Sequence, residues 1–352
     1  MAVRIGFIGS GGIAGSHLST LVDNPGAEVV ALCDVSADSI ERTRASVNRR
    51  ATNGGLGRTL DAATYDEPSR MLRDERLDAV YLCLPPFVHG EPEEAVIAAG
   101  LPMLVEKPVA LDLGTAARLL GQIRDREIMA ASGYQYRYTQ YLARAQQLLE
   151  GKTIGQALVT RFGGTPGTPW YHRQELSGGQ IIEMATHQMD MLRALVGEVR
   201  TVYAAGATRI NNREKPEYDI YDVNSITLIF ENGAIGSFAA NFVVDYRMHL
   251  ESWGLHVFCD DLLVSLTDAV RASTSEGLVE EFPLDDEPMA VEDRAFVRAV
   301  AEGRPELIKS DYESAVRTLA VTLAADRSAR TGKPVDVPSM LAEEAPALGR
   351  VG

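Results

Sequence analysis

Short apolar segments alternate with segments of helical period along the first part of the chain. The apolar runs are continuous, and this is typical of parallel strands that are buried on both faces and joined by helices. One connecting helix is expected to begin after Asp112, which is a favourable N-cap residue. We therefore predict a doubly wound α/β domain. Its predicted strands are Val3 to Ile8, Val29 to Cys33, Ala79 to Leu84, Met103 to Val105 and Ile128 to Ala131.

The pattern changes near residue 133, after which strands follow one another with few helices between them. A linking helix is predicted at Tyr141 to Leu149. Asn232 and Gly233 predict a two-residue hairpin turn in which both residues have positive φ, so that two of the strands pair directly. The second part should therefore contain a mainly antiparallel sheet. Its predicted strands are Thr201 to Ile210, Val223 to Phe230 and Ile235 to Val243.

Residues near the C-terminus carry the signals of one more helix. Ser310 and Glu313 have the spacing of a capping box, and Gly332 followed by Pro334 is expected to end the helix that they begin. We predict two domains, an α/β domain at 1–132 and an α+β domain at 133–352.

Composition and charge exclude several classes of function. The 352 residues are 45% hydrophobic, which is ordinary for a globular protein, and the formal net charge of −15 disfavours nucleic acid and anionic membranes as partners. No apolar run approaches the roughly 20 residues that span a bilayer, and the start of the chain does not resemble a signal peptide. Cys33, Cys83 and Cys259 lie far apart, without metal or disulfide spacing. We expect a soluble, reduced, cytoplasmic protein that binds no metal.

A glycine-rich turn follows the first predicted strand. Gly9, Gly11 and Ala14 have the Gly-x-Gly-x-x-Ala spacing that lets a pyrophosphate approach the backbone at the start of a helix. An isolated motif of this kind is often only a turn, but Asp34 ends the next strand, where a carboxylate binds the adenosine ribose hydroxyls. Because that carboxylate also disfavours a 2′-phosphate, we predict NAD rather than NADP. Arg42, Arg44, Arg49 and Arg50 follow and are interpreted as a solvated surface, with contact to a 2′-phosphate as the alternative.

Two further segments lie where predicted parallel strands end, and ligands bind at that edge of such a sheet. One is Leu84 to His89, which contains Pro85 and Pro86, and the other is Val105 to Pro108, which contains Glu106 and Lys107. The prolines stiffen both turns. A lysine is usually a surface residue, but its place at a strand end makes Lys107 a candidate for chemistry. His17, within the first predicted helix, is interpreted as structural.

These motifs together resemble those of the glucose-fructose oxidoreductase, inositol dehydrogenase and rhizopine catabolism family of dehydrogenases. The segments that carry the resemblance are Gly9 to Ala14, Pro85-Pro86 with His89, Glu106-Lys107-Pro108, Gly133 to Tyr138, and Ser177 to Asp190. They occur in the family's order over most of the chain. The resemblance implies a second domain with an open-faced, mainly antiparallel sheet, and a homodimer or homotetramer.

The resemblance also implies roles for particular residues. Lys107 and His187 are expected to flank the nicotinamide and the reacting carbinol, as catalytic residues. The acid four residues before the histidine is usually aspartate in this family and is Glu183 here, which places its carboxylate one methylene further out. The residues predicted to contact the cofactor are Gly9, Ser10, Gly11, Gly12, Ile13, Asp34, Leu84, Pro85, Pro86, His89, Glu106 and Lys107. Those predicted to contact substrate are Gln135, Arg137, Trp170, His172, Glu183 and His187.

The residue types agree with these roles. Residues four apart on a helix share a face, so Glu183 and His187 are predicted to act on one ligand. A histidine titrates near working pH and can take the hydroxyl proton, and a lysine can either polarise the same oxygen or be the base. Trp170 and Tyr171 offer aromatic faces suited to sugars, and His172 offers a polar edge. Ordinary packing is an equal interpretation for Trp170, as is a plain loop residue for His172.

We therefore predict an NAD-dependent dehydrogenase that acts on a sugar, a polyol or an inositol. Two alternatives remain at this point. One is a glycosidase that uses bound NAD for transient oxidation of a sugar carbon, and the other is a non-enzymatic regulator that senses NAD or a sugar. The presence of both Lys107 and His187 disfavours the regulator.

Overall fold

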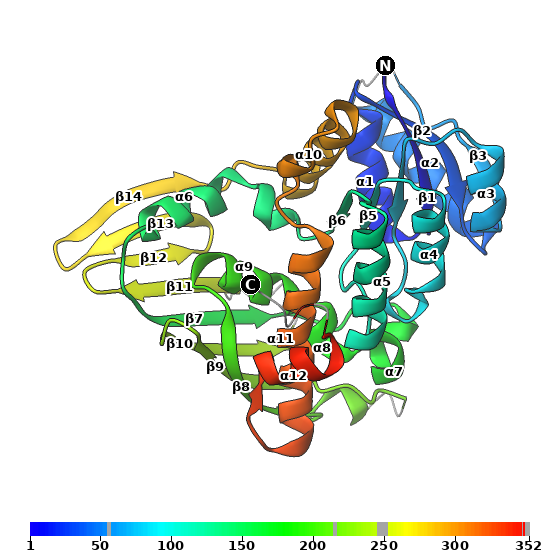
Figure 1. Ribbon diagram of the computed structural model, residues 1–352. Helices are drawn as coiled ribbons and strands as arrows, with labels where there is room; N and C mark the ends of the chain where they lie inside the picture. The colour runs from blue at the N-terminus through cyan, green and yellow to red at the C-terminus, as the bar shows by residue number, and fades with distance from the viewer. Residues whose placement is uncertain (55–57, 214–216, 245–252, 347, 349–352) are drawn as a thin grey trace. The chain divides into compact units, whose positions relative to one another are not determined.

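A computed structural model of the chain describes residues 1–352 except 55–57, 214–216, 245–252, 347 and 349–352 (Figure 1). The chain forms two compact units. Unit 1 comprises Met1–Val109, Arg118–Tyr138 and Glu287–Ser314, and unit 2 comprises Ala110–Ala117, Thr139–Asp286 and Ala315–Gly352. The division into domains at 1–132 and 133–352 stays a prediction, because a compact unit need not be an independently folding domain.

Unit 1 is built on a parallel sheet of six strands in the order β3-β2-β1-β4-β5-β6. The strand order reverses between β1 and β4, and ligands of such sheets bind at this switch point, beyond the carboxyl ends of the strands. The predicted doubly wound architecture is confirmed. The strands are β1 Val3–Ile8, β2 Ala27–Cys33, β3 Ala63–Tyr65, β4 Ala79–Leu82, β5 Met103–Val105 and β6 Ala130–Ser132.

Helices connect these strands, and one helix from late in the chain joins them. The helices in this part of the fold are α1 Gly12–Val22, α2 Ala37–Asn53, α3 Pro68–Asp74, α4 Glu91–Ala98, α5 Leu113–Asp125 and α10 Pro288–Glu302. Asp112 accepts a hydrogen bond from the Thr115 N–H at 2.7 Å, so it caps α5 as predicted. In Figure 1, α10 (orange) runs beside α1 (blue). Phe296 of α10 belongs to the same buried core as Leu18 of α1, so α10 completes the core of unit 1.

Unit 2 is built on a sheet of nine strands in the order β14-β13-β12-β11-β7-β10-β9-β8-β15. Neighbouring strands are antiparallel except β7 and β10, which are parallel, so the predicted mainly antiparallel sheet is confirmed. The strands are β7 Ile154–Phe162, β8 Val199–Ala207, β9 Val223–Phe230, β10 Ile235–Asn241, β11 Trp253–Cys259, β12 Leu263–Leu266, β13 Ala269–Thr274, β14 Gly277–Pro283 and β15 Val335–Asp336.

Unit 2 also contains helices. They are α6 Gln140–Leu149, α7 Gln174–Ser177, α8 Gly179–Glu183, α9 Thr186–Leu195, α11 Tyr312–Thr331 and α12 Val337–Glu344. Helices α6, α8, α9 and α12 contact the sheet directly. Along β9, buried and exposed residues alternate strictly, as expected of a strand with one covered face and one open face.

The hairpin between β9 and β10 forms, but its turn differs from the prediction. The Gly233 N–H donates to Phe230 O, and the Phe230 N–H donates to Ala234 O. Gly233 has φ +89, whereas Glu127 is the one non-glycine residue with positive φ in the described part of the chain. The loop is therefore a three-residue turn with a glycine bulge, in which only Gly233 needs the left-handed conformation. The predicted positive φ at Asn232 is wrong.

Helix α11 begins one residue later than the predicted capping box implies. The Asp311 carboxylate accepts the Ser314 N–H at 2.7 Å, so Asp311 is the capping residue. The Ser310 hydroxyl instead pairs with that of Ser132 at 2.9 Å. The helix ends at Thr331, and Gly332 follows with φ +67, as predicted. Among the described residues, none of the helices combines the length and the apolar character that a membrane span requires.

Candidate functional site

The glycine turn joins β1 to α1 and has the form of a phosphate-binding loop. Gly9 has φ +91, and a side chain there would place its Cβ 2.2 Å from Cys83 O, so only glycine fits. Added Cβ atoms at Gly11 and Gly12 would meet nothing within 4 Å, so the start of α1 has open space beside it. No side chain of the described residues caps α1, and the buried Ser10 hydroxyl has no partner among them. These free donors suit a pyrophosphate.

Asp34 follows β2 and is fixed to the glycine turn. Its Oδ2 accepts the Ser10 N–H at 2.8 Å, and its Oδ1 accepts the Ser36 N–H at 2.9 Å. Each carboxylate oxygen keeps further lone pairs, and the side chain is partly exposed. The carboxylate is therefore held beside the turn with free capacity to accept the ribose hydroxyls of a dinucleotide, as predicted for NAD.

The arginines of α2 bear on the choice between NAD and NADP. Arg44 donates to Ala62 O at 2.8 Å and lies 3.5 Å from Glu41, so its guanidinium is held within its own part of the fold. Arg42, Arg49 and Arg50 are exposed, as predicted for a solvated surface. This arrangement agrees with the preference for NAD.

The loop after β4 contains Pro85 and the short 3-10 helix Pro86–Val88 and ends at His89, whose side chain is buried. His89 Nδ1 lies 2.6 Å from Glu93 Oε1, and the other Glu93 oxygen accepts the Gly90 N–H at 2.7 Å. Burial alone would raise the pKa of Glu93, but the charge of His89 and these hydrogen bonds outweigh it and lower the pKa. His89 Nε2 is buried without a partner among the described residues, so it retains hydrogen-bonding capacity in this loop.

Lys107 lies at the carboxyl end of β5, in the loop that follows it. The Glu106 N–H donates to Leu82 O at 2.9 Å, and Glu106 Oε2 accepts the Lys107 N–H at 3.0 Å. Glu106 is buried, whereas Lys107 is partly exposed. Because β1, β2 and β5 are parallel, Gly9, Asp34 and Lys107 all lie beyond the same edge of the sheet. Gln135 and Arg137, also of unit 1, are half-buried in the 3-10 helix Gln135–Tyr138.

The second proposed catalytic segment lies in unit 2 and is not one helix. Glu183 is the last residue of α8, Met184 and Ala185 form a turn, and His187 is the second residue of α9. The prediction that Glu183 and His187 are four residues apart on one continuous helix is therefore wrong. Both side chains are partly exposed, and their action on one ligand stays a prediction. Gly178 and Gly179 have positive φ and form the turn that leads from α7 into α8.

Glu183 has an aromatic partner that the sequence did not link to it. The Tyr171 hydroxyl donates to Glu183 Oε2, and the Tyr171 ring packs against Phe242 with centroids 5.8 Å apart. Tyr171 is buried, so it fixes the longer glutamate side chain in one orientation. Trp170 packs beside Tyr171 at 5.2 Å.

His172 has a structural role in unit 2. Its Nε2 lies 2.9 Å from Pro166 O, its ring packs against Tyr218 with centroids 5.5 Å apart, and only 6% of the residue is exposed. These contacts occupy the ring. A direct contact between His172 and substrate therefore stays a prediction, and none of these contacts of His172 supports it.

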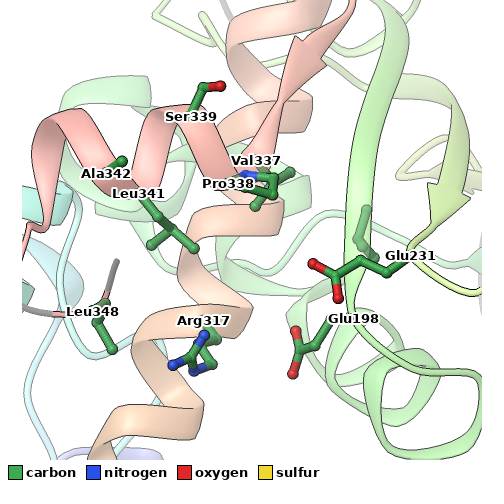
Figure 2. A pocket seen from close by; sticks show the side chains of 10 residues that line it. Glu198, Glu231, Arg317, Val337, Pro338, Ser339, Leu341, Ala342 and Leu348 are labelled. Atoms are coloured by element: carbon green, nitrogen blue, oxygen red, sulfur yellow. The ribbon is translucent and has the colours of Figure 1, made fainter. Parts of the chain in front are cut away.

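A pocket in unit 2 lies apart from the predicted residues. The side chains of Glu198, Glu231 and Arg317 are among those that line it (Figure 2). None of the predicted site residues of unit 2 lines it, so it does not mark the proposed chemistry. The lining residues are Glu198, Val199, Glu231, Arg317, Val337, Pro338, Ser339, Leu341, Ala342 and Leu348.

Comparisons with known proteins match both parts of the chain. Residues 3–134 match the model of the oxidoreductase family with an NAD-binding Rossmann fold, and residues 142–261 match the GFO/IDH/MocA C-terminal domain. The chain is 25% identical to the myo-inositol 2-dehydrogenase of Thermotoga maritima, over 88% of this chain and 91% of that protein. It is 24% identical to the NAD(+)-linked scyllo-inositol 2-dehydrogenase of Bacillus subtilis, over 95% and 96% respectively.

A solved structure shows the same fold. It is that of an oxidoreductase from Agrobacterium radiobacter in complex with NAD+, L-tartaric acid and magnesium. The TM-score is 0.80 at 18% identity, and the match covers 97% of this chain and all of that one. The two family models follow each other along the chain, and each covers most of one of the two sheets. The chain belongs to the GFO/IDH/MocA family of oxidoreductases.

Proposed function

We propose that this protein is an NAD-dependent dehydrogenase that transfers a hydride between nicotinamide and a carbinol of a sugar, a polyol or an inositol. One observation carries the proposal. The glycine turn, the Asp34 carboxylate and Lys107 lie beyond the same edge of one parallel sheet, on both sides of its switch point. A nucleotide site and a candidate proton-transfer or polarising group therefore share one surface of unit 1.

The proposed chemistry divides between the cofactor and the chain. Bound NAD supplies the hydride acceptor. Oxidation of an alcohol also requires that the hydroxyl proton leave, and His187 and Lys107 are the proposed groups for this step. If His187 takes the proton, the Lys107 ammonium hydrogen-bonds the forming carbonyl oxygen. If Lys107 is the base, His187 orients the hydroxyl.

Glu183 is proposed to hold a hydroxyl of the substrate next to the one that reacts. Its Oε2 accepts the Tyr171 hydroxyl, and a carboxylate keeps further lone pairs for substrate hydroxyls. A polyhydroxylated ring offers adjacent hydroxyl donors to such a carboxylate. The inositol dehydrogenases among the relatives support this class of substrate.

We also propose a homo-oligomer, a dimer or a tetramer, that assembles through the open face of the sheet in unit 2. Four large apolar residues there are at least 37% exposed, and the strand register places them on one face: Leu158, Tyr203, Ile229 and Ile235. Light scattering with chromatography measures the mass in solution and tests this proposal. The substitution Tyr203→Glu should shift the mass toward that of the monomer.

A reducing cytoplasm is the proposed compartment, supported by three unpaired cysteines, Cys33, Cys83 and Cys259.

A substrate panel tests the proposed activity. The purified protein is incubated with NAD or NADP and with inositols, sugars, anhydrosugars or glycosides, and the absorbance of reduced nicotinamide is followed. We expect reduction of NAD with at least one polyol, at a higher kcat/KM than with NADP. Release of an aglycone without net reduction would instead assign a glycosidase. No reaction with any member would contradict the proposal.

A further inference from the structure

A buried chain of hydrogen bonds in unit 1 joins α1, α10 and the loop after β5. His17 Nδ1 lies 2.7 Å from Asp293 Oδ1, and His17 Nε2 lies 3.0 Å from Glu106 Oε1. The other Glu106 oxygen accepts the Lys107 backbone N–H at 3.0 Å. His17, Glu106 and Asp293 are 0%, 2% and 1% exposed, so water does not compete for these bonds. This chain of hydrogen bonds therefore ends at the backbone of the proposed catalytic lysine.

The geometry of His17 favours a doubly protonated ring. Both ring nitrogens face carboxylate oxygens, which accept hydrogen bonds when ionised. A neutral imidazole has one donor and one lone pair, so one nitrogen would face a carboxylate with its lone pair. Burial by itself lowers the pKa of His17, but Asp293 and Glu106 outweigh it and raise the pKa well above 6.5.

The other groups around His17 favour the cation as well. Glu292 of α10 brings a carboxylate oxygen within 4.8 Å of the facing atoms of His17 and Glu106. From β4 the Tyr81 ring packs edge-on against the imidazole at 5.2 Å, and Cys83 follows that strand. The Thr20 hydroxyl donates to the other oxygen of Asp293. Within the described residues, the charged groups facing His17 are carboxylates.

A divalent cation is the rival occupant of this cluster, because His17, Glu106 and Glu292 have the composition of a metal site. A metal binds the lone pair of a histidine nitrogen. Here each nitrogen is directed at a carboxylate oxygen at hydrogen-bond distance, so a proton on each nitrogen satisfies the geometry and a metal does not.

Glu106 has little freedom once His17 holds it. A Cβ added to Gly133 would lie 2.6 Å from the Glu106 carboxyl carbon, so the backbone of Gly133 packs directly against the carboxylate. The Glu106 N–H is bound to Leu82 O of β4. Any rotation of the carboxylate would therefore break the bond to His17 or the bond to Lys107.

We propose that His17 is a positioning residue for Lys107: as a buried imidazolium between Asp293 and Glu106, it fixes the carboxylate that holds the Lys107 backbone. The part of this proposal that concerns turnover rests on the proposed function, which gives Lys107 its catalytic role. The chain of hydrogen bonds from Asp293 to Lys107 does not depend on that function. Helix α10, which lies far along the sequence, thereby contributes to the placement of a group at the edge of the sheet.

The protonation state is measured in the wild-type protein with [15N]histidine, and the His17 signals are assigned by their absence in His17→Gln. We expect both ring nitrogens to be protonated at neutral pH, in the apoprotein and with NAD added. A neutral tautomer would overturn the proposal. Stoichiometric metal in the purified protein by mass spectrometry would also overturn it.

The positioning role is measured with two matched variants. The side-chain amide of Asn resembles His Nδ1 in position and that of Gln resembles Nε2, so His17→Asn retains the bond to Asp293 and His17→Gln retains the bond to Glu106. The proteins are labelled with [15N]lysine, and the backbone amide signal of Lys107 is assigned by its absence in Lys107→Met. This signal should stay near its wild-type position in His17→Gln and should move in His17→Asn. Affinity for NADH, measured by fluorescence, should be unchanged in both.

Turnover of myo-inositol, or of the panel member with the highest rate, gives the second readout. His17→Asn should lower kcat by about 10- to 100-fold, the effect of a small misplacement of a reacting group, and His17→Gln should lose less. Ser328→Ala is the control, because it removes buried hydrogen bonds of unit 2 to Ala204 and Lys333 and lowers stability without touching this chain.

The outcomes separate the two proposals. An unmoved Lys107 amide in His17→Asn, or equal loss of kcat in both His17 variants in proportion to their melting temperatures, would overturn the positioning role. Absence of turnover with every panel member would contradict the proposed function, and the amide comparison would still decide whether His17 positions Lys107.

Discussion

Replacing Asp34 with alanine should reverse much of the preference for NAD over NADP. The carboxylate is held by the Ser10 and Ser36 N–H groups at 2.8 and 2.9 Å, so it is fixed before a dinucleotide binds. A hydrogen bond to a charged group contributes about 1.5–3 kcal/mol, so loss of the ribose contact should weaken NAD binding by about 10- to 150-fold. NADP gains because its 2′-phosphate no longer meets a carboxylate, so its affinity should stay constant or rise.

Isothermal titration with NADH and NADPH measures both dissociation constants. Asp38→Ala is the matched control, because Asp38 lies exposed in the first turn of α2, the helix that follows Asp34, and its loss changes the net charge equally. We expect Asp38→Ala to bind both nucleotides as the wild type does. Equal weakening of both nucleotides by Asp34→Ala, or the same selectivity change in Asp38→Ala, would refute the assignment of Asp34 to the ribose.

Three further predictions concern individual contacts. His17→Leu should lower the free energy of unfolding by about 3–5 kcal/mol in urea at neutral pH, because it leaves buried carboxylates without their cation. The folded-state pKa of His17 lies above 6.5, so this stabilisation is complete below pH 6.5 and lost as pH rises through the folded-state pKa; a difference that grows with pH would contradict it. Tyr171→Phe should raise KM for the polyol about fivefold, since Glu183 loses a hydrogen bond of about 1 kcal/mol, and an unchanged KM would speak against substrate binding by Glu183. Gly233→Ala should cost about 1 kcal/mol in thermal unfolding because of its φ of +89, whereas Gly121→Ala within α5 should stabilise; the same sign for both would refute the turn assignment.

The periodicity of the sequence predicted the strands because continuous apolar runs indicate strands buried on both faces, and alternation indicates strands with one open face. The bounds of β1, β5 and β9 agree with the prediction at both ends. The start of α11 was predicted wrongly because neighbouring polar side chains can each cap the same helix. Ser310, Asp311 and Ser314 are neighbours, and Asp311 caps the helix because the Ser310 hydroxyl is already bound to Ser132. The identity of that partner depends on tertiary structure and has no sequence signal.

The sequence predicted those parts of the candidate site that lie directly at the end of a strand or in the turn that follows it. Asp34 and the glycine turn belong to this class, since strand order alone brings them together. The bond between Tyr171 and Glu183 was not predictable, although the sequence had already singled out Tyr171 for an aromatic face suited to sugars. The partners of His17 were further beyond reach, because Asp293 is 276 residues away and lies on a helix whose pattern does not show that it packs in unit 1.

Lys107→Met tests the central claim most directly. The variant keeps the length of the side chain and removes the charged nitrogen, and Lys309→Met, at an exposed position, is the control. Affinity for NADH and the rate of NAD reduction with the best polyol of the panel are measured in both. We predict that Lys107→Met binds NADH as the wild type does and loses turnover, while Lys309→Met retains both. Turnover at the wild-type rate in Lys107→Met would contradict the proposed mechanism.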